Sequence, residues 1–253
     1  MIRGIYAAAA AVFSQQKALN VISNNMTNAS TAGFKSQTTV ESSFGEHLVS
    51  RLSSSEGGNS RPVGSGAFIT VNDTEYTDFS QGTLEITERS ADMAIEGEGY
   101  FLIDSEKYGE VFTRNGGFAL DEDNCLVLPG VGKVLNQSKR SITLDSGSFS
   151  VTGEGTILEN GKETDDLFIA VPDAGSAPEQ AGEGLFFIKD QYKKASGENY
   201  KIIQGALEKS NTNIVREMSR IIAGQNNYQS CIQMIKMSDK INEITVNQIG
   251  RIG

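Results

Sequence analysis

Residues that could carry out chemistry are few and scattered in this chain. His47 is the only histidine among 253 residues, so a metal site that needs two histidines cannot form. Cys125 and Cys231 lie in a strand-like and a helix-like context, and nothing in the sequence places either thiol near His47 as an activated nucleophile. We therefore expect both cysteines to be unpaired packing residues and His47 to lie on a short helix at residues 44–52.

Acidic and glycine-rich runs could bind a cation, a phosphate or a sugar, but each lacks part of the required pattern. A calcium loop beginning at Asp121 needs glycine and glutamate where the chain has Leu126 and Gly132. Residues 96–100 (EGEGY) lack the third glycine and the following helix of a phosphate loop, so we expect a tight turn between strands. The sequence gives no distance between the carboxylates at residues 96–110, so it does not identify any two of them as a glycosidase pair. The sequence predicts no enzymatic activity, metal or cofactor.

The overall charge limits the classes of partner. Lys and Arg number 22 against 32 Asp and Glu, which gives a net charge of -10. That balance argues against the basic surface that nucleic acid or an anionic membrane requires. No run approaches the roughly 18 apolar residues of a membrane-spanning helix. We therefore expect neither nucleic-acid binding nor a membrane span.

The pattern of apolar residues divides the chain into a helical beginning, a β-patterned middle with hairpin turns, and a helical end. A Ser- and Gly-rich stretch at residues 50–66 predicts a flexible connection. We expect a mainly β central domain with an all-β core, and long N- and C-terminal α-helices that pair as a coiled-coil-like stalk. The expected limits are 1–35 for the N-terminal stalk helix and joint, 36–67 for the connecting segment, 68–205 for the β-rich domain and 206–253 for the C-terminal stalk helix.

The first predicted helix carries a stripe with three- and four-residue spacing, as in a heptad pattern. Its positions are Ile2, Ile5, Ala9, Val12, Gln16, Leu19, Ser23 and Met26. Arg3 and the apolar run from Gly4 to Phe13 also imitate a secretory signal. Because the stripe continues past any cleavage site, the pattern favours an uncleaved helix.

The second predicted helix has a matching stripe. Its positions are Ile214, Met218, Ile221, Gln225, Tyr228, Ile232 and Ile235. Asn211 and its polar neighbours supply N-cap chemistry just before the stripe. A helix of about 37 residues is roughly 55 Å long, more than a compact domain needs, so we expect it to pack against the first helix.

Turn residues punctuate the β-patterned middle. Residues 113–118 (TRNGGF) and 159–162 (ENGK) predict hairpin turns in which Asn and Gly adopt positive φ. Within residues 120–127 (LDEDNCLV), we expect Asn124 to be the turn residue.

The stretch after the first helix, residues 20–37, predicts a joint between helix and connection. Asn25 and Asn28 can hydrogen-bond local backbone where the helix ends. Gly33 can take a positive φ that redirects the chain. We expect Phe34 to be an apolar anchor after this turn and Lys35 to be a charge near the helix's carbonyl end.

Motifs in both ends and the middle together resemble the flagellar basal-body rod and hook family of axial proteins. The N-terminal motif is SNNMTNASTAGFK at 23–35, an Asn-Asn-x-x-Asn element followed by Thr-x-Gly-Phe-Lys. The central motifs are DFSQGTL at 78–84, AIEGEGYF at 94–101 and FTRNG at 112–116. The C-terminal motifs are GALEKSNTN at 205–213 and AGQNNY at 223–228.

This resemblance implies a structural subunit of the bacterial flagellar basal-body rod. Such a subunit would be exported by the flagellar type III apparatus without a cleaved signal. It would polymerise through its terminal helices, between the inner and outer membranes, into a helical axial filament that transmits torque from motor to hook. The implied partners are copies of itself, other axial proteins of the rod and hook, and the export apparatus. A hook or hook-junction component, and a secreted carbohydrate-binding or hydrolysing β-protein, remain the alternatives.

Overall fold

The computed structural model divides into two compact units, each described here by itself. The first unit comprises Met1–Met26, Gln37–Tyr76 and Ile214–Gly253, and the second comprises Thr27–Ser36 and Thr77–Asn213. The structure describes residues 2–51, 61–145, 147–173, 178–182, 184–188, 192–195 and 199–249, with backbone alone at 2–3, 41–51, 61–74 and 249.

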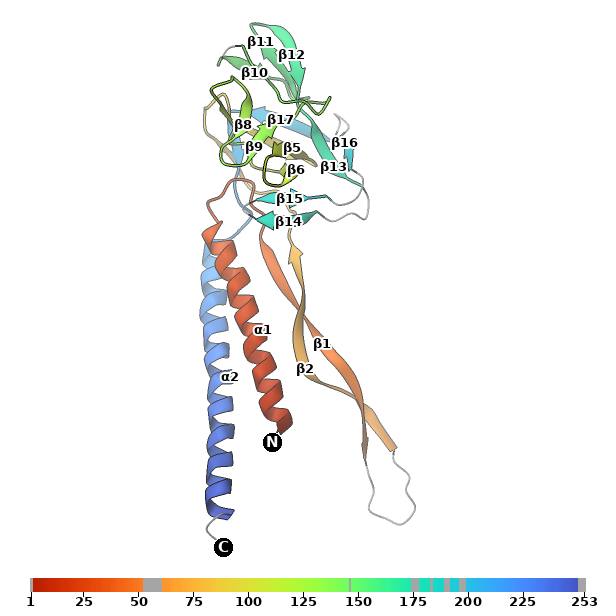
Figure 1. Ribbon diagram of the computed structural model, residues 1–253, viewed down its shortest axis with the longest axis vertical. Helices are drawn as coiled ribbons and strands as arrows, with labels where there is room; N and C mark the ends of the chain where they lie inside the picture. The colour runs from red at the N-terminus through yellow and green to blue at the C-terminus, as the bar shows by residue number, and fades with distance from the viewer. Residues whose placement is uncertain are drawn as a thin grey trace. The chain divides into compact units, whose positions relative to one another are not determined.

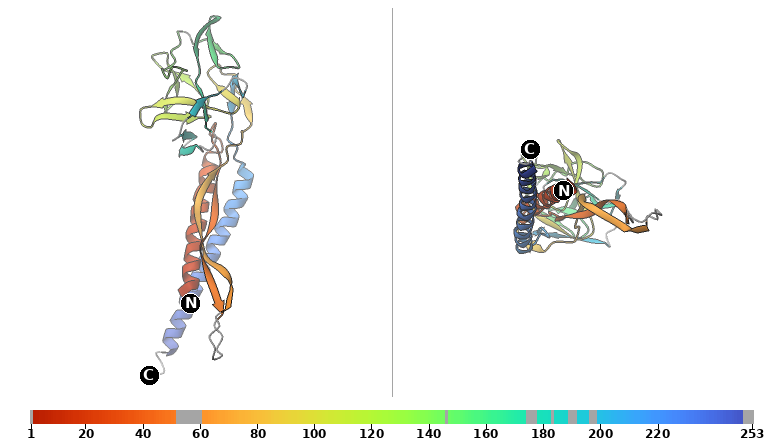
Figure 2. Two further views of the ribbon diagram at one scale, coloured as in Figure 1. Left: turned by 90° about the vertical axis from the view of Figure 1, so that its right-hand side faces the viewer. Right: turned by 90° about the horizontal axis from the view of Figure 1, so that it is seen from below.

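The first unit consists of two helices and a two-stranded sheet (Figure 1). Helix α1 spans Ile2–Thr27 and α2 spans Ile214–Ile249, so both predicted terminal helices are confirmed. Strands β1 (Gln37–Arg51) and β2 (Arg61–Thr77) pair only with each other among the described residues. Figure 2 shows them wound around each other, the strong twist expected of an isolated two-stranded ribbon.

Strands β1 and β2 correct two predictions. Residues 44–51 continue a strand, where we had expected a short helix around His47. The stretch predicted to be flexible, residues 50–66, contains strand residues at 50–51 and 61–66. Val40, Phe44 and Leu48 are spaced by four, which places them on one face of either a helix or a strand. Pairing with β2 decides in favour of the strand. Residues 52–60, and the side chain of His47, lie outside the described residues.

The two helices of the first unit approach each other closely at one point. A Cβ added to Gly224 of α2 would lie 2.9 Å from the Leu19 side chain of α1, closer than real Cβ contacts. The absence of a side chain at Gly224 therefore lets Leu19 pack directly on the backbone of α2.

The second unit consists of short strands that begin with β3 and end with β18. Their bounds are β3 Leu84–Ile86, β4 Met93–Gly97, β5 Tyr100–Ser105, β6 Gly109–Thr113, β7 Ala119–Leu120, β8 Leu126–Leu128, β9 Gly132–Val134, β10 Phe149–Val151, β11 Thr156–Glu159, β12 Lys162–Asp166, β13 Ile169–Pro172, β14 Glu179–Gly182, β15 Leu185–Phe187, β16 Tyr192–Lys194, β17 Tyr200–Gln204 and β18 Ala206–Glu208. The predicted β-rich middle is thus confirmed.

The largest sheet among the described residues follows the order β14-β15-β6-β5-β9-β8-β7, with β13 bridging β5 and β16. Smaller sheets pair β10, β11 and β12, β17 with β4, and β18 with β3. All the recorded strand pairings in this unit are antiparallel.

Strand β5 is buried on both faces and organises the core. Phe101 and Ile103 belong to the larger apolar cluster, whereas Tyr100 and Leu102 belong to a smaller one. The split follows from the strand period of two, which sends alternate side chains to opposite faces. Phe101 also meets Phe118 edge-on, with ring centroids 5.0 Å apart.

Three of the predicted turns are confirmed and one is wrong. Asn160 and Gly161 have φ of 50° and 78° between β11 and β12, and Asn124 has φ of 57°. Residues 97–99 join β4 to β5 with positive φ at both glycines, as the EGEGY run predicted. Residues 113–118 form no hairpin, because β6 pairs with β5 and β15 while β7 pairs with β8. Gly116 is required there for close approach, since a Cβ would lie 1.6 Å from the Met93 carbonyl oxygen.

Candidate functional site

The segment that follows α1 is fixed inside the second unit by Gly33. Its amide donates to the Glu208 carbonyl oxygen at 2.7 Å, and its φ of +69° confirms the predicted left-handed turn. A Cβ at this position would lie 2.3 Å from the Asn115 nitrogen and 2.4 Å from the Arg114 carbonyl carbon. Glycine is therefore required twice over, once for its backbone angle and once for the close contact.

Lys35, two residues further on, is buried with its charge paired. The Nζ atom donates to Glu208 Oε1 at 2.6 Å and to the Ser80 carbonyl oxygen at 2.7 Å. The side chains of Lys35 and Glu208 are 1% and 0% exposed. The expectation that Lys35 interacts with the carbonyl end of the helix is thus wrong, because a carboxylate 173 residues away in the sequence binds it instead.

Arg114 completes a buried group that we call the joint cluster, made of Lys35, Arg114 and Glu208. Arg114 Nη1 lies 3.3 Å from Glu208 Oε2, and Nη2 donates to the Gly97 carbonyl oxygen at 2.7 Å. Its guanidinium lies over the Tyr100 ring, 5.2 Å from the centroid. The amide of Gly82 donates to Glu208 Oε1 at 3.0 Å, so both carboxylate oxygens are bound.

Burial controls the electrostatics of this cluster. Desolvation lowers the pKa of the Lys35 ammonium, while the Glu208 carboxylate opposes the shift. Burial also disfavours the charged form of the Tyr100 phenol, which raises its pKa to about 12. Two cations share one anion without bulk water, and removing one member of such a group typically costs about 3–5 kcal/mol. The joint cluster therefore specifies which segments meet more than it adds net stability.

Asn211 ties the same segments together by neutral hydrogen bonds. Its Oδ1 accepts from the Ser36 amide at 2.8 Å, and its Nδ2 donates to the Asp78 carbonyl oxygen at 2.8 Å. Helix α2 begins three residues later, at Ile214. Asn211, which lies just before α2, thus binds both the segment that follows α1, at Ser36, and the segment that follows β2, at Asp78.

Asn25 performs a similar task within the first unit. Its Nδ2 donates to the Gln37 carbonyl oxygen at 2.7 Å, and its Oδ1 accepts from the Gln37 amide at 2.9 Å. The buried side chain therefore pairs with β1 as a neighbouring strand would. The expectation of hydrogen bonds to local backbone is wrong for Asn25. Asn28 Oδ1 accepts a local hydrogen bond at 3.2 Å, but from the Thr31 side-chain hydroxyl and not from the backbone.

Three family models match separate parts of the chain. "Flagella basal body rod protein" matches residues 5–35, "Flagellar hook protein FlgE/F/G D1 domain" matches residues 94–161, and "Flagellar basal body rod FlgEFG protein C-terminal" matches residues 203–249. A flagellar basal-body rod protein FlgG of Bacillus subtilis (strain 168) is 30% identical, covering 98% of this chain and 99% of the relative.

The chain belongs to the flagellar basal-body rod protein family. Other relatives are the flagellar hook-basal body complex protein FlhO of Bacillus subtilis (strain 168), 27% identical over 100% of both chains, and a FlgF rod protein of Caulobacter vibrioides, 25% identical over 100% of both chains. The chain is thus a structural axial component of the flagellum, and its relatives are rod proteins rather than enzymes.

Each family match contributes one member of the joint cluster. Lys35 falls in the first matched range, Arg114 in the second and Glu208 in the third. Parts of three of the motifs that carried the resemblance therefore meet in space within the second unit, although sequence analysis did not identify the three charged residues as a group.

The sequence around Glu208 contains no signal for this role, because Leu207 is the apolar residue expected to face the core. In β18 it is Ala206 and Glu208 that are buried while Leu207 is half-buried, so the glutamate occupies a core-facing position. A charged residue at such a position requires a partner, but its position in the strand does not show which cation pairs with it.

The helix residues predicted for assembly fall into three classes of exposure. Half-buried are Ile5, Val12, Leu19, Met26, Ile221, Tyr228, Ile232 and Ile235. Exposed are Ile214, Met218 and Gln225, whereas Phe34 is fully buried. The α1 positions with the least exposure are Ser14, Val21 and Asn25. The least exposed positions of α1 thus differ from the predicted stripe, and three predicted positions on α2 lie on an exposed face.

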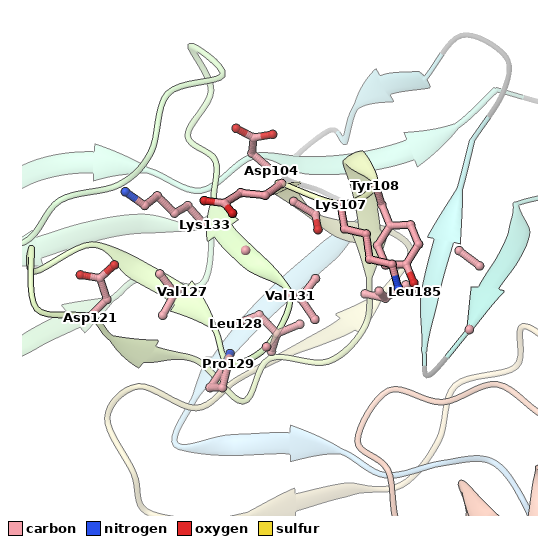
Figure 3. A pocket seen from close by; sticks show the side chains of 16 residues that line it. Asp104, Lys107, Tyr108, Asp121, Val127, Leu128, Pro129, Val131, Lys133 and Leu185 are labelled. Atoms are coloured by element: carbon pink, nitrogen blue, oxygen red, sulfur yellow. The ribbon is translucent and has the colours of Figure 1, made fainter.

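An open depression of about 1000 Å³ lies apart from the joint cluster, on the second unit (Figure 3). Lys107 and Tyr108 line one side, Asp121 and Lys133 the other, with Val127 and Leu128 between them. Its mixed charges define no cation or anion site. Within the described part of the chain, no group of three His, Cys, Asp or Glu residues could hold a metal ion, and both cysteines are free thiols.

Over the same described residues, neither helix has both the length and the hydropathy to cross a membrane.

Proposed function

We propose that the chain is a structural subunit of the bacterial flagellar basal-body rod that polymerises through its terminal helices into a helical axial filament, which transmits torque from motor to hook. The observation that carries this proposal is the surface of α2. Met234, Met237, Ile241 and Ile244 repeat at three- and four-residue spacing, and their exposed fractions range from 45% to 59%. An apolar row along one helix face is the kind of surface that neighbouring subunits cover.

Pairing of α1 with α2 as a coiled-coil-like stalk is part of this proposal. The Leu19 side chain packs on Gly224, and half-buried residues on α2 recur at Ile221, Gly224, Tyr228 and Ile235. That spacing follows the heptad pattern of a helix seam. One face of α2 would then meet its own α1, and the face carrying the row at Met237 would meet other subunits.

The joint cluster supports a role in force transmission. The segments that continue from both helices are bound to each other in the second unit, through Gly33 to Glu208 and through Ser36 to Asn211. A load applied to either helix would therefore reach the same buried contacts. Such contacts resist slippage between segments because breaking them leaves buried charge unpaired.

Export by the flagellar type III apparatus without a cleaved signal, and location in the periplasm-spanning rod, complete the proposal. Other axial proteins of the rod and hook, and copies of this chain, are the proposed partners. Mass spectrometry of the native N-terminus tests the export route: a chain starting at or near Met1 supports it, whereas loss of about ten to twenty residues would favour a cleaved secretory signal.

A hook or hook-junction position is the second candidate, because the model matching residues 94–161 is named for a hook protein as well as for FlgF and FlgG. Imaging purified basal bodies that carry a labelled copy of the chain distinguishes the two. Label between the membranes supports the rod, and label outside the outer membrane supports the hook or its junction.

A matched pair of triple variants tests polymerisation through α2. Met237, Ile241 and Ile244 become Ser in one variant, and Lys236, Lys240 and Glu243, which have the same spacing, become Ser in the control. We expect the first to abolish motility and incorporation into basal bodies, and the control to retain both, because Lys240 and Glu243 are an exposed pair of small energetic weight. Normal incorporation of the first variant, with helicity unchanged by circular dichroism, would contradict the proposal.

A further inference from the structure

Helix α1 exposes two aromatic side chains that the helix pairing leaves unused. Tyr6 and Phe13 are 66% and 72% exposed. They are seven residues apart, which places them within about 20° of each other around a helix. They therefore form one aromatic ridge, and Phe13 lacks a polar tip that would favour contact with water.

The opposite face of α1 lines a cavity of about 290 Å³ within the first unit. Ala18, Leu19 and Ile22 of α1 contribute to it, together with Thr38 of β1 and Ala223 of α2. At about 100° per residue, the three α1 residues lie roughly 140° to 240° around the helix from Phe13. A chain cannot place its own Phe13 in its own cavity.

The walls of this cavity are built by contacts already described. Asn25 holds Gln37, a lining residue, by two hydrogen bonds, and Leu19 is set against Gly224. An engineered apolar cavity of about 150 Å³ is enough to bind benzene, so this one has room for a phenyl ring. Arg220 also lines the cavity and its Nη1 lies 3.0 Å from Glu217, so its charge is paired.

We propose that Phe13 of one copy of the chain inserts into the cavity between α1, β1 and α2 of a second copy. The inference rests on the proposed function, because it names a contact within the polymer. A projection on one face of α1 and a cavity on the opposite face make a heterologous contact, and repetition of such a contact extends a filament instead of closing a dimer. The ridge and the cavity thereby give the filament a direction.

Photocrosslinking in assembled basal bodies tests this contact directly. The full chain carries p-benzoylphenylalanine in place of Phe13 and is the only copy produced in the cell. After irradiation we expect a product of two chains, in which the tryptic peptide containing residue 13 is joined to peptide 221–236, peptide 18–35 or peptide 36–51, which carry most of the residues that line the cavity. The same probe in place of Asp239, an exposed residue on α2 whose replacement leaves every trypsin site intact, is the control and should not label these peptides.

Three variants of the full chain provide the energetic test. Phe13→Ser removes the ring and Ala223→Phe fills the cavity, and each should weaken incorporation about tenfold to a hundredfold, the fold-change expected for losing one buried aromatic side chain. Phe13→Tyr keeps the ring and should retain incorporation. Circular dichroism should be unchanged in all three, because Phe13 and Ala223 are exposed in the single chain.

The outcomes separate the contact from the proposed function. If the wild-type chain is found in the rod and residue 13 crosslinks elsewhere, or only to a different protein, the contact is overturned and the function stands. If Phe13→Ser assembles as well as Phe13→Tyr, the contact is again overturned. Absence of the wild-type chain from basal bodies overturns both proposals together.

Discussion

The two units bury their side chains to very different extents. In the second unit, apolar residues such as Phe101 and Ile103 are fully buried, and even the charges of the joint cluster are withdrawn from water. In the first unit, apolar residues such as Ile222 and Met237 remain about 60% exposed along α2. The difference indicates that the second unit completes its own core, whereas α2 of the first leaves exposed the apolar surface that the proposed assembly would cover.

This comparison also explains where each unit uses its polar contacts. The second unit fixes segments distant in sequence with a buried ion cluster, which is costly to form and very costly to break. The first unit joins α1 to β1 with neutral bonds between Asn25 and Gln37, and its Arg220–Glu217 ion pair keeps the arginine exposed. The costly buried charge therefore lies where segments distant in sequence meet, in the second unit.

The largest effect should come from removing the only anion of the joint cluster. Glu208→Gln leaves Lys35 and Arg114 buried without a counter-charge, and we expect the free energy of unfolding of the second unit to fall by about 3–5 kcal/mol. Urea unfolding followed by near-ultraviolet circular dichroism measures it. Glu85→Gln breaks an exposed pair with Lys209 and should cost less than about 1 kcal/mol. Equal losses of free energy in the two variants would contradict the claim that the buried joint cluster is costlier to break than an exposed ion pair.

Gly33 and Gly109 form a matched pair that separates backbone strain from close packing. Their φ values are +69° and +71°, but only Gly33 has backbone atoms where a Cβ would lie. Gly109→Val should cost about 1–3 kcal/mol from strain alone. Gly33→Val should cost more, release the segment after α1, and abolish motility.

Limited trypsin digestion measures that release, since Lys35 is buried in the wild-type chain and becomes a cleavage site once the segment detaches. If the Gly33→Val chain resists cleavage at Lys35 as well as the Gly109→Val chain does, close packing at Gly33 is not what holds the segment.

High pH should weaken the second unit through Tyr100. Because its pKa is raised to about 12 in the folded chain, the phenol ionises first in the unfolded chain, so its stabilising contribution is complete below about pH 10 and is lost as the pH rises to 12. Two pKa units correspond to roughly 2–3 kcal/mol. Between pH 10 and 12, the wild-type free energy of unfolding should fall by that much more than that of Tyr100→Phe. The lowered pKa of Lys35 changes the free energy of unfolding with pH in the opposite direction. Because Lys35 is present in both chains, its effect cancels in the comparison.

Tyr6→Phe is the control for the alkaline experiment, because Tyr6 is 66% exposed on α1. Its stability should follow the wild-type curve throughout. A Tyr100→Phe chain that also follows the wild-type curve would show that the buried phenol is not responsible for the alkaline loss.

Local patterns predicted the elements of this fold, because helix stripes and Asn-Gly turns are properties of neighbouring residues. Both terminal helices and the turn at Asn160 follow from such patterns. Strand β1 was missed because Val40, Phe44 and Leu48 satisfy the helix and strand periods equally, and only pairing with β2 distinguishes them.

The joint cluster could not be predicted because its contacts join residues far apart in the chain. Arg114 and Glu208 are separated by 94 positions, and Lys35 and Glu208 by 173. Periodicity shows which residues share a face of one element, but not which element covers that face. The sequence marked Gly33 and Asn211 as important for local geometry, whereas their strongest constraints come from Asn115 and Ser36.

The smallest effect should come from the first unit, at Asn25. Asn25→Leu keeps the approximate size of the side chain without adding a charge, but removes both hydrogen bonds to Gln37. We expect a loss of about 1–2 kcal/mol, because the backbone amide and carbonyl of the half-buried Gln37 lose these partners. Asn20→Leu, at an exposed position on the same helix, is the control. Hydrogen exchange of amides in β1 is the measurement, since the first unit can open locally while the second stays folded. Faster exchange in β1 with unchanged exchange in β5 would support independent stability of the two units, and equal acceleration in both strands would show that they unfold as one.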